Sequence, residues 1–111
     1  MSVTTTYKVL GQSNPAATTS TALYTVPAST EAVLSTIMVC NQAATQATFR
    51  VSVSVAGAAL TDKEYIAYDS AVAGNGFVAL TIGITLAATD VVRVYASTAD
   101  ISFSAFGSEI A

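Results

Sequence analysis

The amino-acid sequence predicts an all-β fold, a single antiparallel β-sandwich of about eight short strands with jelly-roll or Greek-key-like connections. Three observations predict it: runs of β-branched residues recur along the chain, turn-forming residues separate them, and no stretch shows helical periodicity. A chain of 111 residues is long enough for one hydrophobic core. We therefore expect one sandwich domain over residues 1–111, in which residues 1–19 form an extended N-terminal arm or an edge strand followed by a loop.

The first half of the chain supplies four expected strands, at residues 4–10, 21–26, 31–41 and 48–55. The first is rich in β-branched residues, and Pro15 in the loop after it is excluded from a central strand. Pro27 ends the second strand. In the fourth, apolar residues from Phe49 to Val55 alternate with polar ones, which predicts one face towards the core and one towards solvent.

The second half supplies four more expected strands, at residues 64–68, 77–82, 90–97 and 100–106. The tripeptide Gly74-Asn75-Gly76 predicts a turn, because Gly and Asn accept a positive φ at little cost. Gly83 follows the 77–82 run and indicates a bulge or a corner. The last strand alternates apolar residues with serine, again the pattern of a half-buried strand.

Charged residues are scarce, at 10% of the chain against about 25% in ordinary soluble domains. The net charge is −3 and the four basic residues do not cluster, so the chain cannot supply the phosphate-neutralising term of nucleic-acid binding. No apolar run approaches the roughly 20 residues of a membrane helix. We expect neither nucleic acid nor a membrane as a partner, and a surface that is largely covered in an assembly.

The residue types argue against an enzyme. The chain has no histidine, which removes the commonest general base and the commonest transition-metal ligand. It has no P-loop, no Rossmann glycine fingerprint and no CxxC pair, so we expect no catalytic residues and no cofactor. Cys40 is the only cysteine, which fits a reducing cytoplasm, and we interpret it as a small core residue. The chain start has no basic segment followed by an apolar block, so no signal peptide is expected.

Three carboxylates are the nearest approach to a metal site. Asp62 and Glu64 point the same way if their segment is extended, and with Asp69 they could hold calcium, which prefers several oxygen ligands. The favoured alternative is a solvated strand edge, guarded by Lys63.

The expected strand at residues 31–41 is apolar on both sides. Strict alternation puts one apolar set, Val33, Ile37 and Val39, on one face, and places on the other face Leu34, Met38 and Cys40. A sandwich buries one face of each sheet, so the second face needs another cover. A neighbouring copy of the chain is the favoured cover, and the loop at residues 11–19 is the competitor.

This argument predicts a homo-oligomer and a set of interface candidates, namely Leu34, Met38, Tyr65 and Tyr68. Tyrosine is enriched at protein interfaces because it buries area and keeps a polar group. Tyr65 and Tyr68 are three residues apart on an expected strand, which places their rings on opposite faces.

Several motifs occur in an order that resembles small structural proteins of tailed bacteriophages. They are LYTVPA at residues 23–28, an apolar strand ending in Asn41, YIAYD at residues 65–69, and LAATDVVRV at residues 86–94, which matches an L-x-x-x-D-x-(V/I)-x-V step. The resemblance runs from about residue 20 to the end of the chain and includes no catalytic signature. Ser29 and Thr89 stand where that pattern usually has glycine.

The resemblance implies a non-enzymatic virion component, assembled in the host cytoplasm. It would be a capsid decoration or cement protein, or a fibre-type or baseplate-associated protein attached to the head or tail. The implied partners are copies of itself, with a trimer as the guess, and another virion protein such as the major capsid protein or a tail protein. The alternative function is a carbohydrate-binding module of a tail fibre that recognises host glycans, although the chain has no tryptophan.

Overall fold

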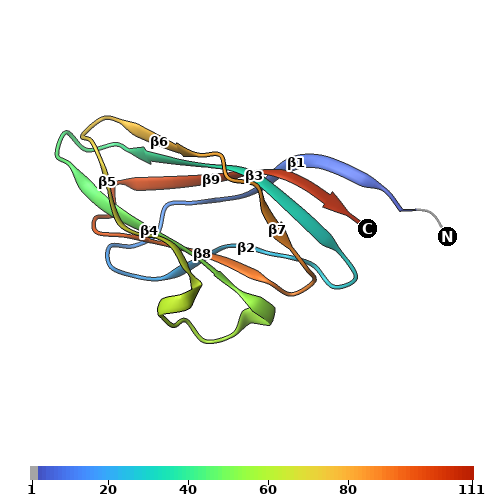
Figure 1. The fold of residues 1–111 in the computed structure, drawn as a ribbon. Coiled ribbons are helices and arrows are strands. Elements are labelled where there is room, and N and C mark those ends of the chain that lie inside the picture. The colour runs from blue at the N-terminus through green and yellow to red at the C-terminus, as the bar shows by residue number, and fades with distance from the viewer. Residues whose placement is uncertain (1–2) are drawn as a thin grey trace.

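The computed structural model describes residues 3–111, which form two antiparallel sheets packed face to face (Figure 1). Sheet A contains β1 (Thr5–Ser13), β3 (Glu31–Asn41), β6 (Phe77–Leu80), β7 (Ile84–Leu86) and β9 (Ile101–Ile110). Sheet B contains β2 (Thr21–Thr25), β4 (Ala47–Ser54), β5 (Tyr65–Val72) and β8 (Val91–Ala96). Two 3-10 helices, η1 (Val55–Gly57) and η2 (Asp62–Glu64), lie between β4 and β5. Met1 and Ser2, the start of the predicted N-terminal arm, lie outside the described residues.

The strand order is that of a jelly roll. Sheet A runs β1-β9-β3-β6, with β7 also paired to β3, and sheet B runs β2-β8-β4-β5. Since β6 and β7 pair with successive parts of β3, they occupy one strand position, and the eight positions follow the connections of two Greek keys. The predicted antiparallel sandwich is therefore confirmed. Gly83, with a φ of 64°, lies in the break between β6 and β7, where the sequence indicated a bulge or a corner.

Several strand bounds differ from the expected ones. β1 continues to Ser13, past the predicted end at residue 10. β9 continues to Ile110, past the predicted end at residue 106, because its last residues pair with β1 on one side and β3 on the other. β5 extends to Val72, and β7 was not predicted as a separate strand. Within residues 3–111 no helix is long and apolar enough to cross a membrane.

The hydrophobic core lies between the two sheets. It is built from inward side chains of nearly every strand, and its largest fully buried members are Phe49, Phe103, Leu34, Ile37 and Ile101. Phe49 of β4 and Phe103 of β9 meet edge to face across the sheets, with ring centroids 6.2 Å apart. Full burial of each large side chain contributes about 1.5–3 kcal/mol relative to exposure, so this layer holds the sheets together.

A β-bulge in β3 corrects the prediction of a strand that is apolar on both faces. Leu34 pairs with Gly107 of β9 and Thr36 pairs with Phe106, so Ser35 is an extra residue that has no partner of its own. An extra residue reverses the alternation of side chains. The core therefore receives Ala32 and Leu34 before the bulge and the odd-numbered Ile37 and Val39 after it.

Gly107 is the residue of β9 that lies opposite this bulge. A Cβ atom on Gly107 would lie 2.0 Å from the carbonyl oxygen of Val33, which is backbone and cannot turn away. Ser35 completes the contact by donating its hydroxyl to the carbonyl oxygen of Phe106 at 3.0 Å. The close approach of β9 to β3 thus requires glycine at position 107.

One end of the sandwich is closed by a hydrogen-bonded charge cluster. Tyr24 of β2 donates its hydroxyl to Glu109 of β9 at 2.5 Å, and Lys8 of β1 pairs with the same carboxylate at 3.1 Å. These bonds from Tyr24 and Lys8 hold the pKa of Glu109 below its usual range. Burial, helped by the neighbouring carboxylate, raises the pKa of Tyr24. The cluster links sheet A to sheet B.

Replacing Gly107 by alanine is expected to lower the free energy of unfolding by about 2 kcal/mol or more, because the added methyl group overpacks against backbone. The measurement is urea unfolding of the purified protein. Gly83→Ala is the matched control: its Cβ would meet nothing within 4 Å, so only the positive φ opposes it, at a net cost of about 1 kcal/mol or less. Equal losses in the two variants would contradict the close approach at Gly107.

Replacing Glu109 by glutamine is expected to remove a pH-dependent part of the stability. Because the folded pKa of Glu109 is depressed, its contribution is present above the unfolded pKa of about 4.3 and is lost as pH falls through the folded pKa. The stability difference between the wild type and Glu109→Gln should therefore narrow between about pH 6 and pH 3. The exposed Glu31→Gln variant is the control, and a gap that stays constant with pH would refute the role of Glu109.

Candidate functional site

By strand register the outer face of sheet A contains five cross-strand rows of side chains. The row at one end, Thr5–Ile110–Glu31, carries the charge of Glu31, and the other four form one continuous surface. These four rows are Tyr7–Ser108–Val33–Thr85, Val9–Phe106–Thr36, Gln12–Ser104–Met38–Ala79 and Ser102–Cys40–Phe77. All of these residues lie in the described part of the chain, and each is apolar or carries a hydroxyl, amide or thiol; none is charged. We call this surface the uncharged face.

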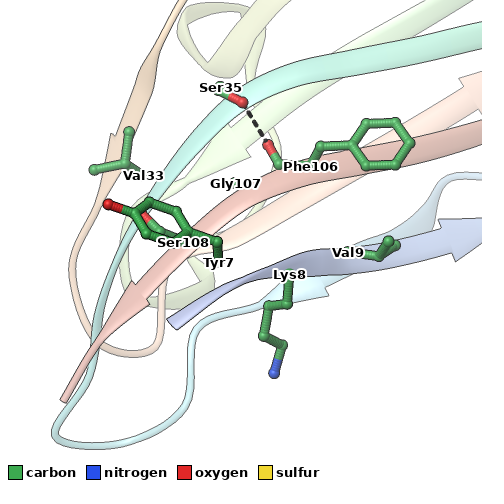
Figure 2. A pocket seen from close by; sticks show the side chains of 8 residues that line it. All are labelled: Tyr7, Lys8, Val9, Val33, Ser35, Phe106, Gly107 and Ser108. Carbon is green, nitrogen blue, oxygen red and sulfur yellow. Dashed lines mark hydrogen bonds between the residues drawn. The ribbon is translucent and has the colours of Figure 1, made fainter. Parts of the chain in front are cut away.

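Several of its apolar side chains are exposed. Tyr7 is 84% exposed, Phe77 71% and Phe106 37%, which is unusual for three aromatic rings on one sheet face. A shallow groove of about 640 Å³ crosses the face between β1, β9 and β3, and Figure 2 shows its lining side chains. Lys8 is directed away from Tyr7 in this view, in keeping with its bond to Glu109. The uncharged face is therefore hollowed as well as apolar.

The outer face of sheet B has a different chemistry. The guanidinium carbon of Arg50 on β4 lies 4.1 Å from the ring centroid of Tyr68 on β5 and 4.3 Å from that of Tyr95 on β8. Arg50 also forms a bidentate ion pair with Asp69, with Nε to Oδ1 at 2.7 Å and Nη2 to Oδ2 at 3.3 Å. Tyr65 packs against Tyr68 edge to face. We call these five residues the tyrosine–arginine cluster.

The pairing of Tyr65 with Tyr68 corrects the prediction that they lie on opposite faces. Their ring centroids are 4.9 Å apart with an interplanar angle of 87°. β5 is irregular here: the register against β4 shifts twice between Tyr65 and Ser70, and Asp69 has a φ of 50°. These irregularities break the alternation on which the prediction depended.

The interface candidates do not form one surface. Leu34 is fully buried in the core, so its assignment to a partner-facing side is wrong, and the β3 bulge is the reason. Met38 is half-buried on the uncharged face, whereas Tyr65 and Tyr68 belong to the opposite sheet. Cys40, interpreted from the sequence as a core residue, is exposed on the uncharged face beside Phe77, again because of the reversed alternation.

The three carboxylates of the calcium hypothesis are not gathered into a site. Asp69 is paired with Arg50, and Glu64 accepts hydrogen bonds from the backbone N–H and the hydroxyl of Thr61 at 2.5 and 2.7 Å. The bonds from Thr61 lower the pKa of Glu64. Of the three carboxylates, only that of Asp62 makes no hydrogen bond or ion pair with residues 3–111, and no group of three possible metal ligands occurs in that range. The three carboxylates are therefore not arranged as the calcium hypothesis requires.

Other residues of both faces escaped the sequence reasoning. Tyr7, Phe106 and Phe77 were placed in strands without being singled out, and Tyr95 was not linked to Arg50. The alternation of β4 placed Arg50 on an outer face, and this was the only signal in the sequence that could have pointed to a cluster around it. Which residues stand beside it depends on β5 and β8, far away in the sequence.

The fold and the chemistry of the two faces do not by themselves identify a protein family. A scan of the chain against protein-family models gave no match, and a search of curated proteins also found none.

Calcium is expected to leave the melting temperature unchanged, because Glu64 and Asp69 are already engaged by Thr61 and Arg50. The measurement is thermal unfolding in excess calcium and in excess chelator. A rise in melting temperature with calcium that disappears in the Asp62→Asn variant would instead establish a cation site at η2.

Proposed function

We propose that this chain is a non-enzymatic structural protein that works by association, with the uncharged face packed against a second copy of the chain. The observation that carries the proposal is the combination of exposed aromatic rings and the lack of charge over four cross-strand rows within the described residues. A partner that binds through charge would find nothing to pair with there. A second copy brings the same apolar and hydroxyl groups and no repulsion.

The dimensions of the face suit such a contact. Strands lie about 4.8 Å apart and rise about 3.4 Å per residue, so the four rows cover roughly 500 Å² per copy. Two copies would bury roughly 1,000 Å², the size at which specific interfaces begin. Burial of apolar area at about 25 cal/mol per Å² drives this association, less the cost of immobilising two molecules.

The resemblance to tailed-phage structural proteins supplies the proposed setting, a virion in which many copies contact one another and a capsid or tail protein. Ser29 and Thr89, which stand where the resembled pattern has glycine, have positive φ values of 57° and 68°, the backbone region that favours glycine. The turns therefore have the shape that the pattern calls for. Copy number in purified particles separates a decoration protein, present in hundreds of copies, from a tail or fibre component.

The test is to place a charge on the uncharged face. Phe106→Asp is expected to shift the protein from oligomer to monomer, because each contact would then bury an unpaired carboxylate. Light scattering after size-exclusion chromatography gives the mass of each species, over a range of protein concentrations. Met38→Asp, in the next row of the face, should act in the same direction.

Val55→Asp is the matched control, since Val55 is 71% exposed in η1 and lies outside the uncharged face. Its oligomeric state should equal that of the wild type. A wild-type chain that stays monomeric at high concentration, or a Val55→Asp variant that dissociates as readily as Phe106→Asp, would refute self-association through this face.

A further inference from the structure

The geometry points to a binding site for a neutral pyranose sugar beside the tyrosine–arginine cluster, in a shallow pocket formed by Asp62, Tyr65 and Tyr68. The pocket has a volume of about 470 Å³ and lies next to the outer face of sheet B. This site is independent of the uncharged face and of the self-association proposed for it.

The aromatic wall of this pocket is held in place before any ligand arrives. The guanidinium of Arg50 lies over one face of Tyr68, Tyr65 packs against Tyr68 edge to face, and Arg50 is itself fixed by the two bonds to Asp69. Tyr68 nevertheless remains 55% exposed. A ring that is rigid and still exposed loses little conformational entropy when a ligand covers it, which favours binding.

The polar group of the pocket is also held in place. Asp62 begins η2, whose first turn is closed by a capping box between Thr61 and Glu64. The carboxylate of Asp62 makes no hydrogen bond or ion pair with any group of residues 3–111, unlike those of Glu64 and Asp69. It is an exposed acceptor beside two aromatic rings, each with a hydroxyl group of its own.

These groups match one face and one edge of a pyranose ring. The C–H groups on one side of a pyranose form an apolar surface that can lie on a tyrosine ring, and the hydroxyl groups at its rim can donate to a carboxylate. Hydrogen bonds to a charged acceptor contribute about 1.5–3 kcal/mol each, more than those between neutral groups.

The same groups argue against ligands of other chemistry. An anionic sugar or a phosphate would be repelled by Asp62, and the positive charge of Arg50 is already balanced by Asp69. An apolar peptide would bury the Asp62 carboxylate without a partner. A quaternary ammonium group is held by several ring faces at once, whereas a pyranose needs a single open face, and the guanidinium of Arg50 already covers one face of Tyr68.

The experiment is an NMR titration of the ¹⁵N-labelled full chain with methyl glycosides of glucose, galactose, mannose and N-acetylglucosamine. A sialic acid glycoside and choline serve as charged comparators. The expected result is that at least one neutral glycoside shifts the amide signals of Asp62, Tyr65 and Tyr68, and that neither comparator does so. The absence of any shift at about 10 mM, enough to populate a millimolar complex, would overturn the proposal, as would a response to a comparator alone.

Variants then separate the roles of the ring and the carboxylate. Tyr68→Ala is expected to weaken binding by about tenfold or more, whereas Tyr68→Phe, which keeps the ring, should keep most of the affinity. Asp62→Asn should weaken the binding of a neutral sugar and strengthen the binding of an anionic one. The exposed Val55→Ala variant is the control and should bind as the wild type does.

Unchanged binding in Tyr68→Ala would overturn the proposed stacking, and tighter binding in Asp62→Asn would overturn the role of the carboxylate. Thermal melting of each variant shows whether it is folded. If Tyr68→Ala is not folded, the comparison of sugar binding by Asp62→Asn and by Val55→Ala tests the proposed site, because both substitutions are at exposed positions outside the core. Oligomeric state is a separate measurement, so failure of this site and failure of self-association are distinguishable.

Discussion

The pairing of β3 with β9 is the constraint on which the rest of the molecule depends. These strands lie at the centre of sheet A, and the single extra residue at Ser35 reverses which side chains point inward. The bulge fits only because Gly107 lets the backbone of β9 come close to Val33. As a result every large apolar side chain of β3 except Val33 and Met38 enters the core, and those two join the outer surface.

The sequence predicted the positions of the strands well, but it predicted less well which side chains of each strand face the core. Alternation identified β4 and β9 as strands with one face towards the core, because a period of two is a local property of the chain. In β4 the predicted solvent face was partly wrong: Ser52 and Ser54 are buried, and Val55 is exposed in η1. The errors at Leu34, Cys40 and the Tyr65–Tyr68 pair all follow a register shift in β3 or β5. A register shift is decided jointly by two strands that are distant in sequence, here residues 31–41 and 101–110, so no local pattern could reveal it.

Most of the few charges of this chain have structural roles, and this helps to explain how four adjacent rows of one sheet face are left without any. Asp90 accepts hydrogen bonds from the backbone N–H groups of Ala56 and Ala87 at 2.9 Å each, tying the loop after β4 to the turn before β8. Glu109 joins the two sheets, and Arg50 with Asp69 orders the outer face of sheet B. Low charge content is thus a property of particular surfaces as well as of the composition.

The two outer faces of a sandwich point in opposite directions, and this decides how the two proposed activities combine. Copies joined through the uncharged face of sheet A would hide that face and turn every tyrosine–arginine cluster outward (Figure 1). A shallow sugar site of this kind gives weak binding when it acts alone, since few groups contact the ligand. Repeated on one rigid assembly, the same site would face a surface that presents many sugars, and the second and later contacts would form at a high effective concentration. Self-association would in that case raise the apparent affinity without changing a single contact in the pocket.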